Sequence, residues 1–236
     1  MWIARKLAVC LCLAVSLSST SSTSDKPPQK PETSHLVFVT EYVRELEAME
    51  SIRASGEEEL KRGAQDDVFS IAIHASTRSQ LELRSEIAQL RGMRLKAPFD
   101  TLIPTLVSFS QQKVERYQRM IDISSAMIAG PKPGVDYGKL AAEMPKIRAE
   151  LEYIDQSLFE ATPLIFATLI DQKEDSKNHV SHLIITKAER EKLLETLSDS
   201  FGSKLDEKKP TYLVGSASVL RDYLRKDWKC SDEPWD

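Results

Sequence analysis

Residues 140–165 read LAAEMPKIRAELEYIDQSLFEATPLI, and their apolar side chains recur at alternating steps of four and three. The apolar positions are Leu140, Met144, Ile147, Leu151, Ile154, Leu158, Ala161 and Ile165. This spacing gathers them on one face of an α-helix, as in a coiled coil or a long helix of a bundle. Pro145 and Pro163 interrupt the pattern, so we expect kinks or a restart of the helix there.

Helical periodicity also dominates the chain before this segment. Residues 36–65 contain an apolar face, but Ser55 and Gly56 leave open whether one helix or two cover the range. Further helices are predicted from Val68 to about residue 96 and from Pro98 or Asp100 to about residue 128. The stretch GPKPG at residues 130–134 predicts a loop, because neither glycine nor proline continues a helix well.

The last third of the chain predicts two shorter helices. Thr186 and Glu189 form a capping box for a helix that ends near Gly202. A final helix is expected over residues 216–228, after a stretch at 212–214 that could be extended. No set of alternating runs indicates a sheet. The predicted fold is therefore all-α, an elongated antiparallel helical bundle of about four long helices plus two shorter C-terminal helices.

The N-terminus has the pattern of a secretory signal peptide. Arg5 and Lys6 precede the apolar run LAVCLCLAVSL at residues 7–17, and small residues follow. The run is too short to cross a bilayer, and no later run is long enough, so we expect no transmembrane segment after cleavage. The predicted organisation is a signal at 1–24, a flexible linker at 25–35, the bundle at 36–172, helices packed on it at 173–229 and a loose tail at 230–236. We therefore expect a secreted or periplasmic protein.

Cleavage would change both the cysteine content and the charge. Cys10 and Cys12 would be lost, so Cys230 alone would remain and no internal disulfide could form. We expect a thiol without a role in a polar tail, with an intermolecular bridge as the alternative. The chain has 36 acidic and 32 basic residues, and residues 1–24 hold two of the basic ones, which leaves 36 against 30. These charges are interspersed, which argues against nucleic acid as a partner.

One cluster has metal-ligand character. If a helix ran through Asp171, Asp175, His179 and His182, steps of four, four and three would place all four on one face. Two imidazoles and two carboxylates would suit a transition metal such as zinc. The charged surroundings and the capping box at Thr186 favour a solvated loop instead, so a metal site is the alternative interpretation. His74, in the apolar stretch IAIHAS, is a second candidate for a buried base, although such a histidine is more often structural.

Signatures of several enzyme classes are missing from the sequence. It contains no G-x-S-x-G, H-E-x-x-H, C-x-x-C, G-x-x-x-x-G-K or G-x-G-x-x-G motif. We therefore expect no cofactor and a bundle that acts by binding a protein partner or a small ligand rather than by catalysis. Self-association through residues 140–165 is one such interaction, and a metal-dependent protein that uses the cluster at 171–182 is the alternative.

Overall fold

The computed structural model describes residues 31–62, 68–171 and 182–234, and the expected signal at 1–24 lies outside these ranges. It is all-α apart from two short strands, as the sequence predicted. No helix in the described ranges has the length and apolarity needed to cross a bilayer. The elements are α1 (His35–Arg62), α2 (Val68–Gly92), α3 (Leu102–Ile128), α4 (Tyr137–Ala167), β1 (Ile170–Asp171), β2 (His182–Leu183), α5 (Lys187–Phe201) and α6 (Tyr212–Leu224).

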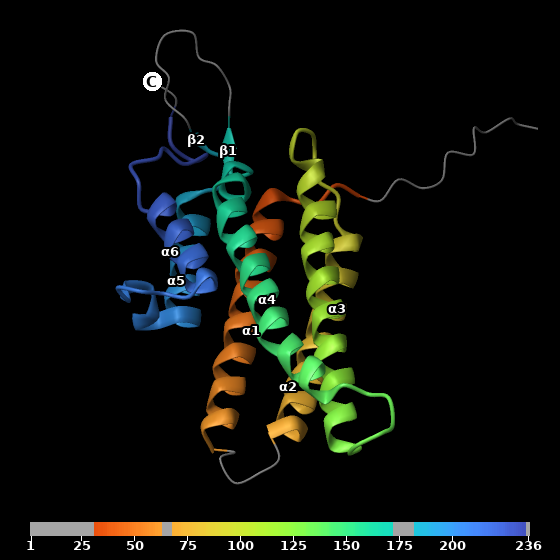
Figure 1. Ribbon diagram of the computed structural model, residues 1–236. Coiled ribbons are helices and arrows are strands. Elements are labelled where there is room, and N and C mark those ends of the chain that lie inside the picture. Colours follow the sequence, from red (N-terminus) through yellow and green to blue (C-terminus); the bar gives the residue numbers. More distant parts are fainter. Residues whose placement is uncertain (1–30, 63–67, 172–181, 235–236) are drawn as a thin grey trace, which may run out of the picture. The chain divides into compact units, whose positions relative to one another are not determined.

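The four long helices run antiparallel to one another in chain order (Figure 1). Helix α2 packs closely on α3, and α3 packs on α4. Helix α6 lies against α4 and α1, while α5 lies against α6 (Figure 1). The C-terminal helices therefore close the side of the bundle that α1 and α4 share.

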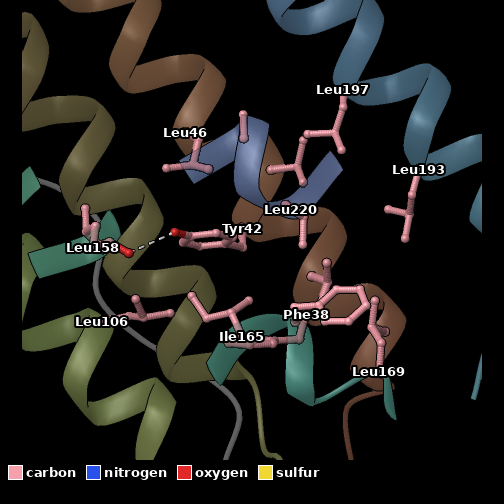
Figure 2. Packing of buried hydrophobic residues seen from close by; sticks show 14 of the residues in the cluster. Phe38, Tyr42, Leu46, Leu106, Leu158, Ile165, Leu169, Leu193, Leu197 and Leu220 are labelled. Atoms are coloured by element: carbon pink, nitrogen blue, oxygen red, sulfur yellow. Dashed lines mark hydrogen bonds between the residues drawn. The ribbon is translucent and has the colours of Figure 1, made fainter. Parts of the chain in front are cut away.

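The main hydrophobic core lies where α1, α4 and α6 meet. Figure 2 shows Phe38 and Leu46 of α1 facing Ile165 of α4 and Leu220 of α6, and each of these four side chains is at most 1% exposed. The Tyr42 hydroxyl donates to the Leu158 carbonyl at 3.3 Å (Figure 2). A buried hydroxyl needs such a partner, so this tyrosine packs like an apolar residue and still ties α1 to α4.

Residues 36–62 form one helix rather than two, because α1 continues through Ser55 and Gly56. Arg53 spans this region: it donates to both carboxylate oxygens of Glu50, at 2.7 and 2.9 Å, and to Glu57 one turn later. Ion pairs at i,i+3 and i,i+4 stabilise a continuous helix and offset the weak helix propensity of glycine.

Helix α4 contains both Pro145 and Pro163 without a break, so the expected restart does not occur. Both prolines are exposed, while Ile147 and Ile165 beside them are buried. A proline on the outer face frees a carbonyl that water can solvate, and packing of the inner face maintains the helix. Pro104 lies in the first turn of α3, where its missing N–H costs nothing.

The predicted loop and caps are present. Gly130 and Gly134 have φ values of +78° and +80°, which other residues rarely adopt, and they flank the turn between α3 and α4. Thr186 and Glu189 form the predicted capping box of α5. Gly202, with φ of +52°, ends that helix.

Two expectations for the C-terminal region were wrong. Residues 212–214 are not extended, because Thr211 caps α6 by accepting from the Val214 amide. The tail is not loose over residues 230–234: Ser231 donates to the Ile185 carbonyl at 2.9 Å, and the Lys187 ammonium lies 2.6 Å from the Glu233 carboxylate. Contacts with a distant segment therefore order a polar stretch that has no local pattern.

Candidate functional site

The structure places half of the predicted metal cluster. Asp171 and His182 are directly opposite each other in the antiparallel pair β1–β2, rather than one turn apart on a helix. His182 is buried, and its backbone also forms an isolated parallel β-bridge with Lys229. Asp175 and His179 lie outside the described residues, and no group of three metal-binding side chains occurs within the described part.

Two other residues singled out from the sequence have different environments from those expected. His74 is exposed on α2, so it is not a buried base. Cys230 is a free thiol and fully buried, with its Sγ 4.0 Å from a guanidinium nitrogen of Arg190. A thiol in this position cannot reach a second chain while the protein is folded.

A buried ion pair crosses the interior between α3 and α4. The Lys113 ammonium lies 2.6 Å from the Asp155 carboxylate and 3.4 Å from the Met49 sulfur of α1. Burial lowers the pKa of Lys113, but the charge of Asp155, the hydrogen bond to it and the charges of Tyr117 and Glu86 together raise the pKa above its ordinary value. Lys113 is therefore charged at neutral pH, and Asp155 is its nearest counter-ion.

A pair of carboxyl groups lies close to this ion pair. Glu45 of α1 and Glu86 of α2 hydrogen-bond to each other, and Glu86 also accepts from the Ser110 hydroxyl of α3. Burial, followed by the charge of Glu86, raises the pKa of Glu45 well above its ordinary range. Burial also raises the pKa of Glu86. Two carboxylates in contact cannot both ionise without strong repulsion, so the pair holds a proton.

Glu45 is short of hydrogen-bond donors. Glu45 is only 8% exposed. No N–H or O–H group of the described residues donates to its buried Oε1. The neighbouring carboxyl of Glu86 can donate only when it is protonated. An unsatisfied buried carboxylate oxygen is unfavourable, so the burial of this atom favours the protonated form of the Glu45–Glu86 pair.

This carboxyl pair lines a pocket of about 630 Å³ between α1 and α2. That volume is within the range of small-molecule sites. Met49, Leu83 and Leu90 form buried apolar parts of its wall. The pocket therefore combines an apolar lining with buried polar groups, as binding sites for small ligands do.

Carboxylates outnumber basic side chains at the rim of the pocket. Arg44 and Arg78 are the basic residues of the lining, and each already has a carboxylate partner on its own helix, Glu41 at 2.5 Å and Glu82 at 3.2 Å. Glu47 adds a further carboxylate to the lining. The rim thus supplies no basic group that would neutralise the carboxyl pair.

Sequence reasoning missed this site because its residues resemble solvent-facing charges. A signal was nevertheless present, since Glu45 and Glu86 are adjacent to the apolar positions Leu46 and Ile87, and Lys113 precedes Val114. A charge beside an apolar helix face can point inward or outward. Only the packing of α1, α2 and α3 around these side chains decided the direction.

Comparison with known proteins adds no assignment. No protein-family model matches the chain, and no curated protein or solved structure matches it significantly.

Proposed function

We propose that this protein is an exported helical bundle that binds a small molecule in the pocket between α1 and α2 and does not act as a catalyst. Support for export comes from the basic, apolar and small-residue order of residues 1–24. Support for binding comes from the pocket of about 630 Å³. The absence of enzyme motifs from the sequence favours binding over catalysis.

The observation that carries the proposal is the buried carboxyl of Glu45 in the pocket lining. A groove lined only by apolar side chains could result from imperfect packing of the two helices and would not by itself indicate a ligand. A buried oxygen without a donor among the described residues is costly to maintain, and a ligand that donates to it would relieve this cost.

Obstruction of the pocket tests the proposal. Ala48 lines the pocket and is exposed, so Ala48→Phe should fill space without disturbing the core. Ala149→Phe, at an exposed site on α4, is the matched control. Ligand-observed NMR with neutral, cationic and anionic fragments should detect binding to the wild type and to the Ala149 variant, and loss of binding in the Ala48 variant. No binding, or binding that Ala48→Phe leaves unchanged, would contradict the proposal.

A metal-dependent protein remains the second candidate. The observation that favours it is the position of Asp171 opposite His182 across the β1–β2 ladder, at the ends of the segment that contains Asp175 and His179. Elemental analysis of the purified protein tests it. Metal well below one equivalent, unchanged in a His179→Ala/His182→Ala double variant, would exclude this candidate.

A protein partner is also part of the proposal, but not through the apolar seam of residues 140–165. Ile147, Ile154 and Leu158 are buried within the chain and are unavailable for a second copy. Self-association would use the outer face of α4, where Tyr153 is 69% exposed. Light scattering over a wide concentration range distinguishes a strict monomer from such a dimer.

A further inference from the structure

We infer that the ligand of the α1–α2 pocket is a small organic cation, with an ammonium group that donates to Glu45 and an apolar body that lies against the apolar wall. This inference rests on the proposed binding function and specifies its ligand class. It depends on the balance of charges around the pocket, on the occupied partners of the nearby cations and on the composition of the wall.

The charges around the buried carboxyl pair, counted with the Lys113–Asp155 ion pair beside it, are negative in balance. Within the described residues, three carboxyl groups, Glu45, Glu86 and Asp155, lie around the single ammonium of Lys113. One proton held between Glu45 and Glu86 still leaves two negative charges against one positive charge. A ligand with one positive charge that displaced this proton would leave the net charge unchanged, so it could take the proton's place without adding to the repulsion between the carboxylates.

The nearby cations are already engaged. Lys113 makes its ion pair with Asp155 at 2.6 Å and acts on Glu45 and Glu86 only as a more distant charge. Arg44 and Arg78 at the rim are paired with carboxylates of their own helices. None of these three cations is therefore free to turn toward Glu45.

The wall of the pocket favours an organic cation over a metal ion. Divalent metals take several oxygen or nitrogen ligands, and the described residues contain no group of three side chains that could provide them. Met49, Leu83 and Leu90 would instead contact a hydrocarbon group. An ammonium has several N–H donors, which match the unsatisfied Oε1 of Glu45.

Binding of such a cation should release the proton held by the carboxyl pair. The proton leaves Glu45 or Glu86 for the buffer, and the ammonium takes its place as donor. The other charged or titratable groups that act on the pair are Tyr42 of α1 and Lys113 of α3, with Asp155 of α4 behind Lys113. Tyr42 keeps its proton and Lys113 stays charged, because the pKa of each is raised, so release approaches one proton per ligand.

Titration calorimetry with three probes of equal length tests the inference. Hexylammonium should bind at pH 7 more tightly than neutral hexanol, and hexanoate should bind least. Measurements in buffers of different ionisation enthalpy should show proton release with hexylammonium alone. Glu45→Gln should weaken hexylammonium at least about tenfold, because a charge-assisted hydrogen bond is lost, and should leave hexanol unchanged.

Glu47→Gln is the matched control, because Glu47 also lines the pocket but is exposed. It should change hexylammonium binding by less than about twofold, since exposed charges are screened. If Glu45→Gln does not fold, Glu86→Gln removes charge from the same pair and should weaken hexylammonium in the same way.

The outcomes separate the inference from the proposed function. Hexanol or hexanoate binding that Ala48→Phe abolishes, without preference for hexylammonium, would overturn the cation inference and leave the binding function standing. An equal loss in Glu45→Gln and Glu47→Gln would also overturn it. Failure of all three probes and of the wider fragment set would overturn the binding function itself.

Discussion

The Lys113 ammonium lies 2.6 Å from the Asp155 carboxylate, and this ion pair joins α3 to α4 inside the bundle. Lys113 is almost fully buried, whereas the side chain of Asp155 is 19% exposed. The two partners therefore differ in what their removal leaves behind. Loss of Asp155 leaves the Lys113 ammonium unpaired and without access to water. Loss of Lys113 leaves the Asp155 carboxylate unpaired, but water can partly reach it.

This asymmetry predicts the order of stabilities in a double-mutant cycle. Asp155→Asn should lower the free energy of unfolding by about 3 kcal/mol, because it leaves Lys113 charged and unpaired. Lys113→Met should cost less, and adding it to Asp155→Asn should recover part of the loss. Urea unfolding measures all three variants. Glu82→Gln, which removes the exposed partner of Arg78, should change stability by less than about 1 kcal/mol. Equal losses in both single variants would contradict the asymmetry.

The carboxyl pair predicts a stability that falls as pH rises. Burial raises the pKa of Glu45 in the folded chain above its ordinary value of 4.5, so the folded state binds more protons than the unfolded state above pH 4.5. The stabilising contribution of the proton is complete below pH 4.5 and is lost as pH rises through the raised pKa. Glu45→Gln removes this loss, so the variant should be more stable than the wild type at pH 8 and similar to it near pH 4.

Glu50 gives the opposite slope and provides an internal comparison. Burial opposes its ionisation, but the hydrogen bonds and charge of Arg53, the hydrogen bond from Thr211 and the charge of Lys204 together lower its pKa. Its contribution to stability is therefore present above pH 4.5 and is lost as pH falls through the lowered pKa. Glu50→Gln should destabilise the protein at pH 7 and have less effect in acid. Thermal unfolding curves from pH 3 to 8 measure both variants, and parallel curves for the two would contradict this assignment.

Arg190 should control the order of the C-terminal tail. Its guanidinium donates to the carbonyls of Leu224 and Lys226, both at 2.6 Å, and to that of Trp228 at 3.2 Å. Arg190→Lys cannot make these bonds together, because an ammonium lacks the planar fork. We expect a loss of about 2–3 kcal/mol and faster amide exchange over residues 224–234. Arg225→Lys, at an exposed site, is the control and should leave exchange unchanged.

The buried position of Cys230 predicts slow thiol chemistry. In a Cys10→Ser/Cys12→Ser background, the remaining thiol should react with an aromatic disulfide reagent only at the rate of unfolding. Addition of urea should raise this rate to that of a free thiol. Rapid reaction under native conditions, or a disulfide-linked dimer on non-reducing gels, would contradict the position of Cys230.

The helical segments and several of their ends were predictable because they depend on local chemistry. The apolar spacing of residues 140–165 predicted α4, and Thr186 with Glu189 predicted the start of α5. Local patterns misled where packing overrides them. Residues 212–214 look extended by composition but are helical, since Thr211 caps them and Leu213 and Val214 are buried in the core.

The candidate site was not predictable, because its residues come from four different helices. Glu45, Glu86, Lys113 and Asp155 are each ordinary helical charges in the sequence. The metal-like spacing of Asp171 and His182 assumed a helix, whereas the chain pairs them across two strands. Spacing along the chain has meaning only after the local conformation is known.

The sequence by itself determined that this chain is helical, that its long helices have apolar faces and where several of them begin and end, since these follow from periodicity and capping between near neighbours. The tertiary structure alone decided which charges are buried. Glu45 and Glu86 are 41 positions apart, and only the packing of α1 beside α2 brings their carboxyls into contact and buries Glu45. Desolvation and the proximity of like charges are properties of that packing, and they raise the pKa of Glu45.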